Sequence, residues 1–166
     1  MSTYEPIMTA LLALLQAKCG GTFQTYKRRF VMWEQLAQQV PAIAQPALFL
    51  FDGVGLGGGR IKYAQKQRGL PPRRTLLRTI VLYAQIPGGG TPGGPDATTP
   101  GGTVLGPLAE SVEAALATVD DPVQGTLTLG GLVSHCWIEG DGHWVVGDID
   151  PNGQGMVTIP VNIMVP

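Results

Sequence analysis

A glycine-rich segment is the first feature of the chain that could do chemistry. Residues 53–58 have the G-x-G-x-x-G spacing that brings the backbone of dinucleotide-binding folds close to a pyrophosphate. That site also needs a helix that begins in the glycines and an acidic residue about 20 positions further on. Residues 60–67 are too short for this helix, and no carboxylate lies between Asp52 and Asp96. No Gly-Lys-Ser/Thr follows either, so we predict no nucleotide cofactor.

Two other groups resemble metal sites. Residues 148–153 place Asp, Asp, Asn and Gly as the opening of a calcium loop does, but the twelfth position is Ile159 where a bidentate Glu is needed. A tight turn accounts for the same residues. His135 and Cys136 are neighbours on a predicted strand, so they should point to opposite faces and not share a zinc ion with His143.

No residues with the spacing of a catalytic site are apparent in the sequence. There is no G-x-S-x-G nucleophile motif, and the two cysteines, Cys19 and Cys136, are most simply two free thiols. We therefore predict a protein that is not an enzyme and that has no catalytic, cofactor-binding or metal-binding residues.

The distribution of charge is the most informative feature of the chain. Residues 1–78 hold all eleven Lys and Arg with three acidic residues, a net charge of +8, whereas residues 79–166 hold no basic residue and nine acidic ones, a net charge of −9. Complementary patches of this kind steer association and set its register. The alternative is that the two halves pair inside one fold.

We predict that residues of these two charged groups form a subunit or ring interface. On a strand, Arg74 and Arg78 share a face that Arg73 does not. Nucleic acid is another reading of the basic clusters, but the sequence pI of about 6.1 argues against a dedicated nucleic-acid binder. The candidate interface residues are Lys27, Arg28, Arg29, Arg73, Arg74, Arg78, Asp120, Asp121, Asp148 and Asp150.

The composition fits one domain with buried apolar surface. A length of 166 residues suits a single domain spanning 1–166. Only 14% of the residues are charged, against about 25% in ordinary domains, so we expect some apolar surface to be covered by other chains. The longest apolar run, Ile7–Leu15, is too short to span a bilayer and lacks a basic leader, so we predict a cytosolic product.

Periodicity predicts an α+β fold, with a mainly antiparallel sheet and two principal helices packed on it. The predicted helices are Ser2–Lys18 and Leu105–Val119. The predicted strands are Thr22–Trp33, Ala47–Phe51, Arg60–Gln67, Arg73–Ile86, Leu127–Glu139 and Met156–Val165, with a polar turn at Gly140–Gly155. Of these, Arg73–Ile86 should be a central strand covered on both faces, because both of its faces are largely apolar after Thr79.

The expected core has one stripe on each helix. The stripes are Ile7, Leu11, Leu14, Leu15 and Lys18 on the first helix, and Leu108, Val112, Ala115, Leu116 and Val119 on the second. We also expect Trp137 to be buried in the same core. Residues 87–106 are rich in glycine and proline and have no large apolar side chain before Val104, so we predict a long mobile loop there.

Five stretches resemble the tail terminator, or tail-completion, proteins of long-tailed bacteriophages, of the minor tail protein U type. They are Arg28–Trp33, Gln45–Phe49, Gly69–Leu76, Leu129–Gly140 and Val157–Val161, and they follow the family order over most of the chain.

This resemblance implies a subunit that closes into a homo-hexameric ring. Such a ring caps the head-proximal end of the tail tube, ends its polymerisation and gives the neck a surface to join. The implied partners are further copies of the chain, the major tail tube protein and a neck or head-completion protein, with DNA passing through the ring without specific binding. The implied location is the virion tail, reached from the host cytoplasm. The alternative is another neck or head–tail connector component that contacts the portal side.

Overall fold

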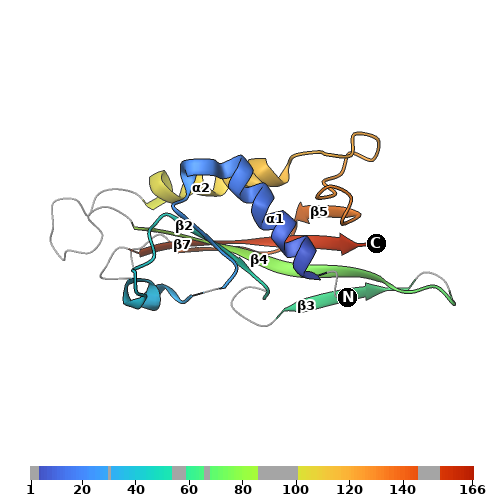
Figure 1. Cartoon of the computed structure of the whole chain (residues 1–166), viewed down its shortest axis with the longest axis horizontal. Coiled ribbons are helices and arrows are strands. Elements are labelled where there is room, and N and C mark those ends of the chain that lie inside the picture. Colours follow the sequence, from blue (N-terminus) through green and yellow to red (C-terminus); the bar gives the residue numbers. More distant parts are fainter. Residues whose placement is uncertain (1–3, 30, 54–58, 66–67, 86–100, 146–153) are drawn as a thin grey trace.

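The computed structural model describes residues 4–29, 31–53, 59–65, 68–85, 101–145 and 154–166. Two helices pack on one face of a seven-stranded sheet that is antiparallel except where β1 meets β2 (Figure 1). The predicted α+β class is therefore confirmed. In the described residues, neither helix is long and apolar enough to cross a membrane.

The elements follow one another in the order that the periodicity predicts, with three additions. The bounds are α1 (Tyr4–Cys19), η1 (Gly20–Thr22), β1 (Thr25–Lys27), η2 (Trp33–Gln38), β2 (Ala47–Phe51), β3 (Arg60–Ala64), β4 (Arg73–Gln85), α2 (Gly101–Leu116), β5 (His135–Ile138), β6 (His143–Val145) and β7 (Gln154–Val165). The additions are the two short 3-10 helices and β6.

β4 and β7 form the centre of the sheet and pair from Arg74 opposite Val165 to Gln85 opposite Gln154. On the outer side of β4, β2 pairs with its second part and β3 with its first part. On the outer side of β7, β6 pairs with its first part and β5 with its second part. Because β4 and β7 are antiparallel, β3 and β6 lie at diagonally opposite corners of the sheet.

The main core lies between the helices and the sheet. In α1, an acidic residue in the first turn and a basic one in the last turn both suit the helix dipole. The buried side chains of α1 are Ile7, Met8, Leu11, Leu15 and Cys19, and those of α2 include Leu105, Leu108, Val112, Ala115 and Leu116. The predicted stripes are thus largely confirmed. They were wrong at Lys18, which is exposed, and at Val119, which lies beyond the end of α2.

Helix α2 begins earlier than predicted. It starts at Gly101 and includes Pro107, so the predicted mobile loop 87–106 is wrong for its last six residues. The sequence predicts a helix start close to Pro107, because proline is favoured in the first turn of a helix. Leu105 is fully buried, and its packing stabilises the additional turns. The rest of the predicted loop lies outside the described residues.

A second, smaller core covers part of the opposite face of the sheet. Its buried members are Leu36, Ile43, Ala47, Phe49, Val81 and Tyr83. Ile80 and Leu82 point to the helices, whereas Val81 and Tyr83 point to this second core. The prediction that β4 is covered on both faces is therefore confirmed for its second part.

The predicted strand Leu127–Glu139 is wrong in its first part. Leu129, Gly130 and Gly131 have φ angles of 52°, 72° and 88°, which no strand can accommodate. Only β5 remains extended. Trp137 is half-buried on the face away from the helices, because its neighbour Cys136 points into the main core. The expectation that Trp137 belongs to that core is therefore wrong.

Two further boundaries differ from the prediction. The first predicted strand, Thr22–Trp33, is reduced to β1, and the chain turns into η2 after it. The predicted polar turn Gly140–Gly155 contains β6, which pairs with β7 through backbone hydrogen bonds. His143-Trp-Val145 is too short to show a period, so only the pairing partner reveals this strand.

Candidate functional site

The residues that could bind a metal are kept apart by the sheet. Cys136 is fully buried under the helices, and burial raises the pKa of its thiol to about 12. His135 lies on the other face, where its ring stacks on Trp137 at 4.9 Å and its Nδ1 accepts a hydrogen bond from the Leu127 N–H at 3.3 Å. In the described part of the chain, no three His, Cys, Asp or Glu side chains are grouped as metal ligands.

Cys19 is the second buried thiol. Its Sγ donates a hydrogen bond to the Ser111 carbonyl at 3.5 Å, across the contact between α1 and α2. Burial raises the pKa of Cys19, which makes it a poor nucleophile at neutral pH. Residues 54–58 of the glycine segment, the whole calcium-like turn at 148–153, and with it the candidates Asp148 and Asp150, lie outside the described residues.

Two of the candidate interface arginines are engaged inside the subunit. Arg28 contacts the carboxylates of Glu5 and Asp52, each at 3.2 Å, and Arg78 lies 3.8 Å from Asp52. Burial lowers the pKa of Arg78, and the nearby Asp52 charge partly offsets that effect. Both acidic partners belong to the basic first half of the chain. Among the described residues, no ion pair joins that half to the acidic second half.

The other candidate cations lie on the surface. Lys27 and Arg29 are exposed at β1 and just after it. Arg73 is exposed at the start of β4, whereas Arg74 is half-buried and packs against Tyr4. Its Nη1 donates to the Tyr4 hydroxyl at 3.3 Å, and its guanidinium lies 5.8 Å from the centre of that ring.

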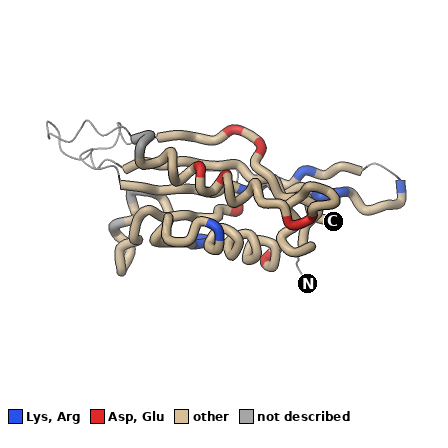
Figure 2. The backbone as a smooth tube through the Cα atoms, turned by 90° about the horizontal axis from the view of Figure 1, so that it is seen from above, with Lys and Arg blue, Asp and Glu red and all other residues tan. Residues whose placement is uncertain are grey.

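The β3–β4 hairpin is a basic projection of the molecule. We call its described residues, 60–65 and 68–77, the basic arm. Figure 2 shows Lys and Arg along this hairpin where it extends from one end of the molecule. Its exposed cations are Arg60, Lys62, Arg68 and Arg73, and the arm contains no acidic residue. It also exposes Tyr63 and Leu70, by 64% and 56%.

The predicted acidic candidates Asp120 and Asp121 hold a turn. The Asp120 carboxylate accepts hydrogen bonds from the backbone N–H groups of Thr128 and Gly130, at 2.5 Å and 2.9 Å. Slight desolvation would raise the pKa of Asp120, but these hydrogen bonds outweigh it and lower the pKa. Asp121 accepts from Val123 and Gln124 in the same way.

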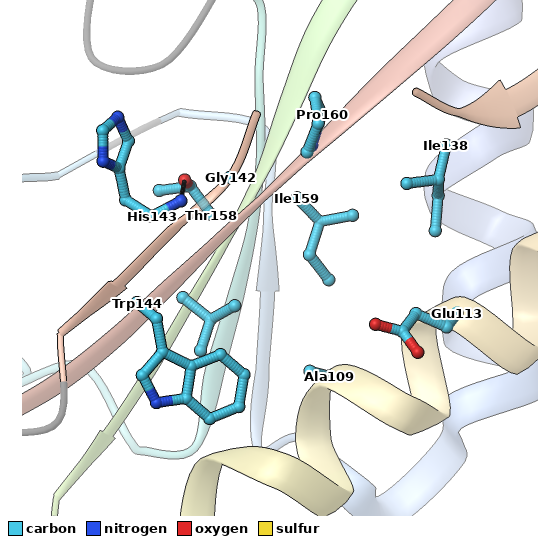
Figure 3. Close-up of a pocket in the computed structure, with 10 residues that line it drawn as sticks. Ala109, Glu113, Ile138, Gly142, His143, Trp144, Thr158, Ile159 and Pro160 are labelled. Carbon is cyan, nitrogen blue, oxygen red and sulfur yellow. Dashed lines mark hydrogen bonds between the residues drawn. The ribbon is translucent and has the colours of Figure 1, made fainter. Parts of the chain in front are cut away.

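A cavity of about 290 Å³ lies at the corner of the sheet opposite the basic arm. We call it the Glu113 pocket. Figure 3 shows the Glu113 carboxylate and the Trp144 indole on two sides of an apolar floor, with the His143 ring turned away. Trp144 is 48% exposed. The lining residues are Ala109 and Glu113 of α2, Ile138 of β5, Gly142, His143 and Trp144 at β6, and Val157, Thr158, Ile159 and Pro160 of β7.

Such a pocket suits recognition of a cation. A carboxylate beside an indole attracts an ammonium or guanidinium group, and the apolar floor accommodates the alkyl stem. The sequence alone does not reveal this site, because its walls come from four elements spread over residues 109–160. The local signal was Trp144, a large aromatic residue in a stretch read as a polar turn.

The chain was also compared with known proteins. No protein-family model matches it, and no curated protein sequence matches it.

Proposed function

We propose that this chain is a structural subunit that associates with copies of itself into a ring at the head-proximal end of a phage tail. The ring ends polymerisation of the tail tube and presents a surface for head–tail joining. The tube protein and a neck protein are its other partners, and the virion is its final location. The resemblance of five sequence stretches to tail terminator proteins supplies the biological context.

The observation that carries self-association is the placement of charge. The four exposed cations of the basic arm have no carboxylate partner among the described residues. Glu113, Glu139 and Asp141 are exposed on the second half of the chain, and among the described residues they form no ion pair either. Two opposite surfaces that are not neutralised within one subunit can neutralise each other between subunits.

The composition supports the same proposal. A chain with few charges and several exposed apolar side chains has surface to bury against partners. Both thiols are buried with raised pKa values, which makes both of them poor nucleophiles at neutral pH. These features suit a structural protein better than a hydrolase.

The test combines a mass measurement with tube assembly. We expect the pure protein to form a closed oligomer as its concentration rises in sedimentation velocity, and less of it at high salt, because screening weakens charge contacts. Added to polymerising tail tubes, it should bind one tube end and stop growth, as seen by electron microscopy. A monomer at all concentrations that leaves tube length unchanged would contradict the proposal. Binding to the portal side instead of the tube would identify another connector component.

A further inference from the structure

We propose that the basic arm of one copy docks at the Glu113 pocket of a second copy. This inference rests on the proposed self-association and names the two surfaces that meet. The arm contains β3 and the pocket is lined by β6, and these strands lie at diagonally opposite corners of the sheet. The two surfaces are therefore different parts of the same molecule.

The sheet topology gives the contact its direction. β3 lies on the outer side of β4, next to Arg73–Leu77, whereas β6 lies on the outer side of β7, next to Met156–Thr158. The two central strands therefore lie between β3 and β6 of the same subunit, and the two outer strands pair with different parts of their length. A contact between unlike surfaces of identical chains is head-to-tail, and repeated head-to-tail contacts close into a ring when the rotation allows it.

The chemistry of the two surfaces is complementary. The arm offers exposed Arg and Lys side chains with long alkyl stems. The pocket offers the Glu113 carboxylate, the half-exposed Trp144 indole and the apolar floor of Ile138 and Ile159. A cation held between a carboxylate and an aromatic face gains both an ion pair and a cation–π contact, while its stem covers apolar surface.

The exposed apolar groups of both surfaces strengthen this assignment. On the arm, Tyr63 and Leu70 are more than half exposed. At the pocket, Trp144 is nearly half exposed. Tyr and Trp are enriched in interface cores. β3 is also an edge strand on which every residue but Ile61 is exposed. Lys62 on this edge disfavours indiscriminate strand pairing, so the arm is left for a partner of opposite charge.

An acidic protein surface fits the arm better than nucleic acid does. The same subunit carries a net charge of −9 on residues 79–166, which would repel a polyanion. That acidic part includes Glu113 of the pocket and Asp141, which precedes the lining residue Gly142 in the chain, so a second copy supplies the complementary surface without any other component.

Charge-swapped variants test the contact. The arm variant carries Lys62→Glu and Arg73→Glu, and the pocket variant carries Glu113→Lys. None of these side chains makes an ion pair or a side-chain hydrogen bond in the described structure, so both variants should fold, which circular dichroism and thermal melting would check. We expect each variant alone to associate at least tenfold more weakly than the wild type in sedimentation velocity.

Mixing the two variants is the decisive step. In a 1:1 mixture, each reversed arm meets a reversed pocket and each unchanged arm meets an unchanged pocket, so association should return to within threefold of the wild type. One chain with all three substitutions should associate equally well. Matched controls are Lys18→Glu and Glu110→Lys, which reverse exposed charges on α1 and α2 outside both surfaces and should leave association unchanged.

The outcomes separate the contact from the proposed function. If the wild type associates and caps tubes but the mixture is not rescued, the arm–pocket contact is overturned while the proposed function stands. If the wild type remains monomeric and does not cap tubes, both are overturned. If the arm variant associates normally but loses binding to a fluorescent DNA duplex that the wild type binds, the arm serves nucleic acid and the proposed contact is wrong.

Discussion

The two parts of β4 show how one strand serves two purposes. From Thr79 to Ala84 every side chain is buried, with alternate residues in the main core and in the second core. From Arg73 to Leu77 only Leu76 is fully buried, and β3 replaces β2 as the outer neighbour. A single extended strand can therefore stabilise the fold at one end and present charge at the other, depending on what covers its faces.

The largest expected effect lies in the buried part of the strand. Leu82→Ala should lower the free energy of unfolding by about 2–5 kcal/mol, because it leaves a cavity under the helices. Leu77→Ala, at a half-buried site of the arm, is the matched control. It should lower the free energy of unfolding clearly less than Leu82→Ala does. Urea unfolding of both variants measures the difference. Equal losses would show that the two parts of β4 are packed alike.

The junction between the two parts should give the next effect. Asp52 lies between Arg28 and Arg78, and Arg78 is the first residue of β4 after the basic arm. Asp52→Asn removes the carboxylate that the two guanidinium groups share. We expect it to lower the free energy of unfolding by about 1–2 kcal/mol at low salt, as measured by urea unfolding.

The salt dependence and a control sharpen this prediction. The loss should shrink as ionic strength rises, because Asp52 is 55% exposed and its interactions are screened. Glu5→Gln, which removes a 74% exposed partner of Arg28 only, should cost about 0.5 kcal/mol or less. An equal cost for both variants would place the stabilisation in Arg28 alone.

A tyrosine pair compares the two parts with the same chemical change. The Tyr83 hydroxyl donates to the Val31 carbonyl at 2.9 Å and ties the segment before η2 to the sheet. Tyr83→Phe should cost about 1 kcal/mol in thermal unfolding, the usual net value of such a bond. Tyr63→Phe on the exposed arm should leave the melting temperature unchanged. A matching loss at Tyr63 would mean that the arm packs within the subunit.

The smallest effect concerns the Asp120 carboxylate. Its charge stabilises the fold, in contrast to the exposed cations of the basic arm. The pKa of Asp120 is lowered in the folded chain, so its carboxylate adds stability above its ordinary pKa of about 3.8 and loses that contribution as the pH falls through the lower folded value. Because Asp120 is exposed and solvent screens its charge, Asp120→Asn should lower the free energy of unfolding at pH 7 by only about 0.5–1 kcal/mol.

The pH dependence distinguishes this charge from a merely exposed one. The stability gap between wild type and Asp120→Asn should narrow as the pH is lowered below about 4, as measured by chemical unfolding at each pH. A gap that stays constant would show that the hydrogen bonds to Thr128 and Gly130 do not depend on the ionised carboxylate.

Much of the fold follows from local patterns. The sequence predicts most of the helix stripes, the strand Ala47–Phe51 and the apolar character of both faces of β4. Each of these segments is long or regular enough for its period to indicate its surroundings. The shorter elements could not be predicted in this way. β6 forms because β7 offers it backbone partners. The turn at Thr128–Gly131 is held by Asp120, which accepts hydrogen bonds from the N–H groups of Thr128 and Gly130, eight and ten residues further along the chain.

The sequence by itself determined the separation of charge, the identity of the two helices and the lack of acidic residues in the arm, since these depend only on the order of residues. Tertiary structure alone decided which charges are neutralised. Arg28 and Arg78 meet Glu5 and Asp52 because α1, β2 and β4 converge there, while Glu113 and Trp144, 31 residues apart, face one pocket. Ion pairs and pockets are made by distances in space, and the sheet topology sets those distances.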